Sequence, residues 1–345
     1  MTHSSNSKTA LIVGAGGGVG GELARALLAR GWSVRGLARN PAKAAAAVGL
    51  DAVDWRKGDA MDAASVLLAA RGCTVIVHAV NPPGYHNWAG TVLPMLESTI
   101  AAAKAVGPRI VFPGTVYNFG PDAFPVLTEA SPQRPRTIKG ALRAAMEQRL
   151  AEAAGEGVPV LIVRAGDFFG RRAVNSWFAQ GLIRAGKPVS MILNPGSRGV
   201  GHAWAYLPDV AETMARLIER ADTLDDFSVF HFAGHWLEDG VQMAHAIRRV
   251  VGRKVAILPF PWPLMTLLSP FVETFREMGE MRYLWREPLR LDNAKLIGVL
   301  GEEPHTPLDA AVRASLIGLG SLAMPAARAS TPGAFPTSIE SIEVG

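Results

Sequence analysis

The sequence predicts an α/β protein with a doubly wound parallel sheet. After a polar start, an apolar run typical of a buried strand leads into a cluster of glycines and then into a segment with leucines and alanines at helical spacing. Short apolar runs and helical stretches alternate as far as about residue 170, which is the pattern of parallel strands joined by crossover helices. With 49% hydrophobic and 19% charged residues, the chain has the composition of a globular protein.

The predicted elements follow one another in a regular order. Strands are expected at 9–13, 32–38, 53–57, 74–78, 109–112, 158–164 and 227–232, and helices at 21–31, 87–106, 139–150 and 208–220. Segments 124–137 and 165–170 are typical of loops. We expect a core at 9–170, a smaller substrate-binding part at 171–322 that is interleaved with the last core strands, a flexible start at 1–8 and a disordered tail at 323–345.

The glycine cluster between the first strand and the first helix predicts a ligand. Its members are Gly14, Gly16, Gly17, Gly18, Val19 and Gly20. Glycines without Cβ atoms let a phosphate approach the backbone, and the N–H groups at the start of a helix attract an anion. Because the cluster stands between a strand and a helix, we expect a dinucleotide site rather than a merely flexible turn.

The end of the second strand indicates which dinucleotide binds. An NAD site places an acidic residue there, about 20 residues beyond the glycines, to bind the ribose hydroxyls. This chain has Arg39 at that position and Lys43 one helical turn later. A guanidinium holds a 2′-phosphate through paired hydrogen bonds, whereas a carboxylate repels it. The sequence therefore favours NADP, and a solvated surface arginine is the alternative.

Further residues at the carboxyl edge complete the predicted cofactor site, because ligands of open α/β sheets bind at that edge. They are Asp59 and Ala60 after the third strand, Ala79, Val80 and Asn81 after the fourth, and Gly166, Asp167 and Phe168 after the sixth. Asp59 is expected either to accept a hydrogen bond from the adenine amino group or to cap the helix that starts near Asp62. His78 is more typical of a satisfied core histidine than of a catalyst.

Charged residues recur at every fourth position of the helix near 139–150. Lys139, Arg143 and Glu147 share one face of that helix. The face is either solvated, with an ion pair between Arg143 and Glu147, or turned into the site. In the loop after the fifth strand, the hydroxyls of Thr115 and Tyr117 can point into the same crevice.

Five motifs together resemble the short-chain dehydrogenase/reductase superfamily over about residues 8 to 320. They are the Gly14-x-x-Gly17-x-x-Gly20 spacing, the Gly58-Asp59 pair, Val116-Tyr117, the run Arg-Ala-Gly-Asp-Phe-Phe-Gly at 164–170 and the run Tyr-Leu-Pro-Asp-Val-Ala at 206–211. The likeness is to the extended and atypical branch of NAD(P)-dependent epimerases, dehydratases and reductases. It implies a Rossmann fold and a bound nicotinamide dinucleotide.

The chain departs from the catalytic set that this resemblance implies. The superfamily uses a Ser or Thr after the fifth strand and a Tyr-x-x-x-Lys pair on the next helix. Here Pro113 stands four residues before Tyr117, at the serine position. Alignment on Glu147 places Lys139 at the tyrosine position and Arg143 at the lysine position. The usual tyrosine mechanism is therefore not expected at that site.

Two roles remain open for Lys139. The Lys-x-x-x-Arg pair is similar to that of the isoflavone-reductase-like and NmrA-like branch, in which some reductases use NADPH with a lysine as acid/base and regulatory members bind the dinucleotide without catalysis. Such a lysine needs a pKa lowered by burial or by a nearby positive charge, and Arg143 supplies that charge. In the other register Lys139 is the superfamily lysine, which holds the nicotinamide ribose, and Pro135 stands at the tyrosine position.

The leading hypothesis is an NADPH-dependent oxidoreductase that transfers hydride to a small, partly apolar carbonyl or enone substrate. Lys139, with Tyr117, is expected to protonate or polarise the substrate oxygen. The residues expected to border the substrate are Tyr117, Asn118, Phe168, Phe169 and Tyr206. The alternatives are a sugar-nucleotide epimerase or dehydratase and a non-catalytic, NADP-binding redox sensor.

Bulk properties limit the partners and the location. The net charge of +5 is dispersed and no nucleic-acid reader motif is evident. The apolar segment 255–268 contains Pro259, Pro261 and Pro263 and makes a poor membrane span. The single cysteine, Cys73, excludes internal disulfides and a cysteine metal cluster and fits a reducing cytosol. We expect a cytoplasmic protein with a small-molecule substrate and no metal, and a homodimer remains open.

Overall fold

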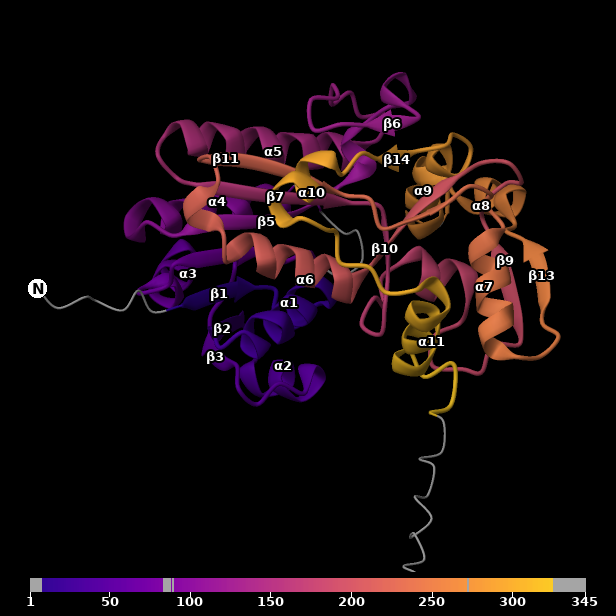
Figure 1. Cartoon of the computed structure of the whole chain (residues 1–345), viewed down its shortest axis with the longest axis horizontal. Coiled ribbons are helices and arrows are strands. Elements are labelled where there is room, and N and C mark those ends of the chain that lie inside the picture. Colours follow the sequence, from indigo (N-terminus) through magenta and orange to yellow (C-terminus); the bar gives the residue numbers. More distant parts are fainter. Residues whose placement is uncertain (1–7, 83–87, 89, 272, 325–345) are drawn as a thin grey trace, which may run out of the picture.

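Seven parallel strands form the central sheet of the protein, here a computed structural model that describes residues 8–82, 88, 90–271 and 273–324 (Figure 1). The strands are β1 (Thr9–Val13), β2 (Ser33–Ala38), β3 (Asp54–Lys57), β4 (Val75–His78), β5 (Arg109–Thr115), β7 (Val160–Ala165) and β11 (Phe227–Phe232). Their order is β11-β7-β5-β4-β1-β2-β3, so the direction of winding reverses between β1 and β4. The predicted doubly wound sheet is confirmed, and this reversal opens a crevice at the carboxyl ends of β1 and β4.

Helices cover both faces of the sheet because each carries an apolar stripe. One face is covered by α1 (Gly18–Ala29), α6 (Leu207–Ile218) and α10 (Ala294–Leu300), and the other by α3 (Ala63–Ala70), α4 (Val92–Val106) and α5 (Ile138–Gly155) (Figure 1). Leu23 and Leu27, one turn apart on α1, are fully buried together with Met214 and Leu217 of α6. α2 (Pro41–Val48) contacts β2 and β3.

The fifth strand extends further than predicted, through Pro113 to Thr115. β4 pairs with β5 only as far as Val111, whereas β7 pairs with it up to Thr115. Proline has no N–H to give to a ladder, and it is tolerated here because one flank of the strand is already open. Thr115 therefore stands beyond the end of β4, at the carboxyl edge.

The segment predicted as a loop at 165–170 contains a further strand, β8 (Asp167–Phe169). β8 pairs in parallel with β10 (His202–Tyr206), and β10 pairs with β12 (His235–Leu237). Gly166 makes the bend between β7 and β8, since a Cβ on it would lie 2.3 Å from the carbonyl oxygen of Ala203. The loop prediction is wrong for these three residues because the partner strand lies far along the chain.

Most of the remaining elements gather beside one end of the sheet (Figure 1). They are β6 (Val126–Leu127), β14 (Arg290–Leu291), β9 (Met191–Asn194), β13 (Ala256–Pro259), α7 (Gln242–Val251), α8 (Trp262–Leu268), α9 (Glu273–Glu280), α11 (Leu308–Gly318) and the short helices η1 (Val116–Asn118), η2 (Pro121–Ala123), η3 (Trp177–Leu182) and η5 (Met281–Trp285). The short helix η4 (Ala221–Thr223) lies at the other end, where Ala221 accepts a hydrogen bond from Arg109 at the start of β5. β6 lies inside the segment 124–137 that was predicted as a loop. None of the helices within the described ranges has the length and apolarity to cross a membrane.

Three predictions fall wholly or partly outside the described residues. They concern the start at 1–8, of which only Lys8 is described, the first turn of the helix predicted from 87, and all but the first two residues of the tail at 323–345. α4 begins at Val92.

Candidate functional site

The glycine loop leaves β1 under tight steric limits. Gly14 has a φ of +98°, and a Cβ on it would lie 2.6 Å from the backbone of Ala79 and Val80. A Cβ on Gly20 would lie 2.3 Å from the carbonyl oxygen of Gly14, so α1 starts directly against the loop. Gly16 faces open space, and Gly17 caps α1 without a side-chain hydrogen bond. The loop thus has the room and the free helical N–H groups that a pyrophosphate needs.

The ends of β2 and β3 present charged side chains beside this loop. Arg39 and Lys43 are exposed, and within the described part of the chain neither forms an ion pair. Asp59 is half-buried and accepts a hydrogen bond from the N–H of Met61 at 3.0 Å. The alternative that Asp59 caps the next helix is wrong, because Asp62 accepts from the first N–H groups of α3. Ala60 is buried.

The fourth strand ends next to the glycine loop. Ala79 and Val80 are half-buried and lie against Gly14, and Asn81 is exposed. Asn81 accepts a hydrogen bond from the guanidinium of Arg143 at 3.1 Å. His78 is fully buried and bonds Thr99 at 2.8 Å, and this burial lowers its pKa to about 3. It is therefore a neutral core histidine, as expected.

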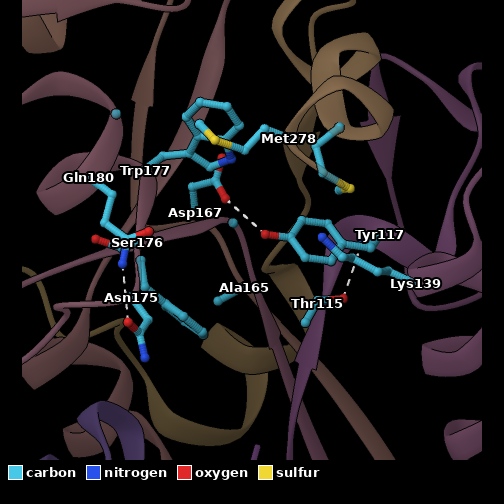
Figure 2. Close-up of a pocket in the computed structure, with 14 residues that line it drawn as sticks. Thr115, Tyr117, Lys139, Ala165, Asp167, Asn175, Ser176, Trp177, Gln180 and Met278 are labelled. Carbon is cyan, nitrogen blue, oxygen red and sulfur yellow. Dashed lines mark hydrogen bonds between the residues drawn. The ribbon is translucent and has the colours of Figure 1, made fainter. Parts of the chain in front are cut away.

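A pocket opens at the carboxyl ends of β5 and β7 (Figure 2). It encloses about 800 Å³ of atom-free space, part of which is open to solvent. The lining residues are Thr115, Tyr117, Lys139, Ala165, Gly166, Asp167, Phe168, Asn175, Ser176, Trp177, Gln180, Gly181, Met278 and Met281. Polar groups from the sheet edge and α5 thus face apolar side chains from the η3 region and α9.

Lys139 and Tyr117 are brought together by the start of α5. Thr137 caps this helix by accepting from the N–H of Gly140 at 3.0 Å. A Cβ on Gly140 would lie 2.2 Å from the carbonyl oxygen of Tyr117, so only glycine allows the first turn of α5 to pack on η1. Lys139 is 5% exposed and lines the same pocket as Tyr117.

The charged face of α5 is not a solvated stripe. Arg143 reaches Asn81 and lies over the ring of Trp88, 5.3 Å from its centroid. Glu147 is buried and pairs with the buried Arg164 of β7. The ion pair that the solvated alternative required between Arg143 and Glu147 is therefore replaced by contacts from other parts of the chain.

Tyr117 and Asp167 are joined by a hydrogen bond that extends to a residue that sequence reasoning did not single out. The Tyr117 hydroxyl donates to Asp167 Oδ1 at 3.3 Å (Figure 2). Asp167 Oδ2 lies 2.8 Å from Nε2 of His202, the first residue of β10. No spacing rule connects residues 117, 167 and 202, and only the pairing of β8 with β10 brings them together. The Asp167 carboxylate, predicted to face the cofactor, is held by these two side chains.

Three of the residues predicted to border the substrate do not line this pocket. Asn118 is fully buried and donates to Gln133 at 3.0 Å. Phe169 is fully buried with its ring centroid 5.3 Å from that of Tyr206, and burial raises the pKa of Tyr206. Successive residues of a strand point to opposite faces, so Phe168 faces the pocket and Phe169 faces the core.

The sequence of the described crevice and core matches a known family. The profile of the NAD dependent epimerase/dehydratase family matches residues 10–231. The chain belongs to this family. The match confirms the prediction of an NAD(P)-dependent, oxidoreductase-type enzyme with a Rossmann fold.

Individual proteins resemble this chain either over a short stretch or at low sequence identity. Cinnamoyl-CoA reductase 1 of Oryza sativa subsp. japonica is 40% identical over 77 residues, which are 21% of this chain and only 23% of the length of that reductase. A putative epimerase from Burkholderia cenocepacia J2315 has a TM-score of 0.69 at 20% identity and covers 92% of this chain and 99% of its own. UDP-glucuronic acid 4-epimerase from Bacillus cereus, solved with UDP-glucuronic acid and NAD, has a TM-score of 0.70 at 14% identity, with 90% and 98% covered. These structures establish the shared fold.

Proposed function

We propose that the protein is an NADPH-dependent reductase of a small, partly apolar carbonyl or enone compound. The observation that carries this proposal is the meeting of Lys139 and Tyr117 in one pocket, opposite apolar side chains that include Phe168, Trp177 and Met281. A reduced dinucleotide bound at the glycine loop supplies the hydride. Lys139 and Tyr117 hold the substrate oxygen, on which negative charge develops as the carbon takes the hydride, and they polarise or protonate it.

The choice of NADPH rests on the end of β2. Arg39 and Lys43 are exposed cations beside the crevice, and the position that binds ribose hydroxyls in NAD enzymes carries no carboxylate. A 2′-phosphate gives Arg39 a bidentate anionic partner. The residues proposed to surround the rest of the cofactor are the glycine loop, Asp59 and Ala60, residues 79–81 and residues 166–168, and in the alternative register Lys139 holds the nicotinamide ribose.

Replacement of Lys139 tests the proposal. Lys139→Met is expected to lower kcat with a panel of aldehydes, ketones and enones by about 100-fold, because the oxygen loses its charged partner. NADPH affinity, measured by fluorescence titration, is expected to stay unchanged. Lys254→Met is the matched control, since Lys254 is exposed before β13. A loss confined to NADPH affinity would contradict the acid/base role and favour the alternative register.

Family membership supports a second candidate, a sugar-nucleotide epimerase or dehydratase that restores its cofactor in each cycle. It predicts conversion of a UDP-sugar without net oxidation of NADPH. The apolar side of the pocket favours the reductase. A third candidate, a redox sensor, predicts NADPH binding with neither kind of turnover, so one assay with carbonyl compounds and UDP-sugars separates the three.

A further inference from the structure

Two buried histidines, His231 and His202, differ in the hydrogen-bonding groups that face their ring nitrogens. His231 Nε2 accepts from the guanidinium of Arg164 at 2.6 Å, and its Nδ1 donates to the carbonyl oxygen of Leu127 at 3.2 Å. One neighbour donates and the other accepts, so His231 is a neutral imidazole, and burial followed by the charge of Arg164 lowers its pKa to about 3.

His202 has acceptors on both sides. Its Nδ1 lies 3.3 Å from the carbonyl oxygen of Leu284 and its Nε2 lies 2.8 Å from Asp167 Oδ2. A carbonyl oxygen has no proton to give, so Nδ1 must carry one. The contact with Asp167 then needs a second proton, either on Nε2 beside a carboxylate or on Asp167 itself. In both cases the pair holds one proton more than a neutral histidine beside a carboxylate.

The surroundings of His202 suit an imidazolium. Its ring stacks on the indole of Trp285 with 3.9 Å between centroids and 5° between planes, and an aromatic face attracts a cation. His202 and Asp167 are each 7% exposed, so their interaction is only weakly screened. Burial, and then the negative charge of Asp167, raise the pKa of the neighbouring Tyr283, which donates its own hydroxyl to Phe119 at 3.1 Å.

We propose that Asp167 and His202 are positioning residues that hold Tyr117 and store the proton that replaces the one which Tyr117 gives to the substrate. The inference rests on the proposed reduction, and it assigns protonation to Tyr117 and polarisation of the oxygen to Lys139. Of the three hydrogen-bonded residues, Tyr117 and Asp167 line the main pocket, whereas His202 lies behind Asp167 and does not line it.

Each proton in the step is accounted for. The reduced nicotinamide would supply hydride to the carbonyl carbon, and the carbonyl oxygen would take the proton of the Tyr117 hydroxyl as that O–H bond breaks. The stored proton moves through Asp167 onto the Tyr117 oxygen and leaves His202 neutral, with Nδ1–H still donated to Leu284. Water restores the stored proton before the next turnover. The alcohol product thus carries the hydride and one proton.

The charged and titratable groups around the pair come from several elements. Tyr117 of η1 and Asp167 of β8 contact each other. The negative charge of Asp167 raises the pKa of Tyr283 of η5, and the positive charge of Arg136 lowers it. Lys139 of α5 shares the pocket with Asp167. Of these groups, Asp167 alone bonds both His202 and Tyr117.

The first test needs neither substrate nor cofactor. In the full chain labelled with ¹⁵N-histidine, the His202 signals are assigned by their loss in His202→Gln. We expect both ring nitrogens of His202 to show proton-coupled signals near neutral pH, with the proton on Nε2 lost or shared less strongly in Asp167→Asn. An Nε2 that carries no proton, beside an ionised Asp167, would overturn the inference while leaving the proposed reductase intact.

The second test follows the stored proton through catalysis. Because reduction needs this proton, kcat of the wild type is expected to fall as the pH rises, whereas kcat of His202→Gln is expected to be about tenfold lower and independent of pH. Gln keeps an N–H for Asp167 but cannot store a proton. Tyr117→Phe is expected to lose about 100-fold in kcat.

Tyr283→Phe is the matched control for Tyr117→Phe and keeps the wild-type pH profile. A His202→Gln profile parallel to that of the wild type would mean a merely structural role and would overturn the inference. Absence of turnover with every carbonyl, despite a doubly protonated His202, would instead refute the proposed reduction and with it the use of the stored proton.

Discussion

The dinucleotide crevice and the pocket beside it are built in different ways. The crevice starts from one continuous stretch that comprises β1, the glycine loop and α1. Within it Gly20 packs directly against the backbone of Gly14, six residues earlier in the sequence. The pocket takes its lining from five separate segments, at 115–117, 139, 165–168, 175–181 and 278–281. A local pattern thus determines the first region, while the second depends on which strands pair.

Replacing Gly20 tests how strictly the crevice depends on its local pattern, and it has the largest expected effect. In Gly20→Val the Cβ would lie 2.3 Å from the carbonyl oxygen of Gly14, so the loop must change its path. We expect NADPH affinity, measured by calorimetric titration, to fall by at least about 100-fold, close to 3 kcal/mol.

Gly155→Ala is the control for this variant, because a Cβ on Gly155, at the end of α5, meets no atom within 4 Å. Wild-type affinity in Gly20→Val would show that the dinucleotide binds elsewhere.

Acidification compares two strands of the central sheet through one buried histidine on each. The pKa values of His78, on β4, and His231, on β11, are about 3 in the folded chain, below the ordinary value of 6.5. The unfolded chain therefore binds more protons between these values, and stability present above about pH 6.5 is lost as the pH falls towards 3. From pH 7 to pH 5 each histidine contributes a loss of about 1 to 2 kcal/mol.

Urea unfolding at these two pH values, with His78→Gln and His231→Gln, measures that contribution. If the sheet unfolds as one unit, each variant removes a similar part of the acid-induced loss. If only one of the two variants reduced the acid-induced loss, β4 and β11 would unfold separately.

Removal of the positive charge of Arg39 at the end of β2 has the smallest expected effect on dinucleotide affinity. Arg39→Ser is expected to weaken NADPH about tenfold, or 1.4 kcal/mol, and to leave NADH unchanged, because only NADPH has a 2′-phosphate. Arg56→Ser is the control, since Arg56 is exposed on β3 and pairs with Asp54. Equal weakening of both dinucleotides would contradict the preference for NADP.

The sequence predicts what repeats locally and misses what depends on distant pairing. All seven strands of the sheet were predicted within a few residues, because buried parallel strands are continuous apolar runs. Pro113 led to the prediction that β5 ends at residue 112. The sequence does not show that β5 continues to Thr115 by pairing with β7 on one side only. The motifs predicted that Lys139 and Tyr117 face one site, and both line the pocket, but they gave no sign of His202, whose contact with Asp167 depends on the pairing of β8 with β10 in a segment that the sequence predicts to be a loop.

The parallel pairing of β8 with β10 has a consequence for how such an enzyme can diversify. The chain leaves this short sheet after Phe169 and returns at His202, and the excursion between them supplies Ser176, Trp177 and Gln180 to the pocket wall. Asp167 and His202 lie at the two anchoring strands and not on the excursion. Substitutions of Ser176 and Gln180 are therefore expected to change what the pocket admits while Asp167 and His202 keep their places on the two strands, so that specificity can evolve separately from the acid–base groups.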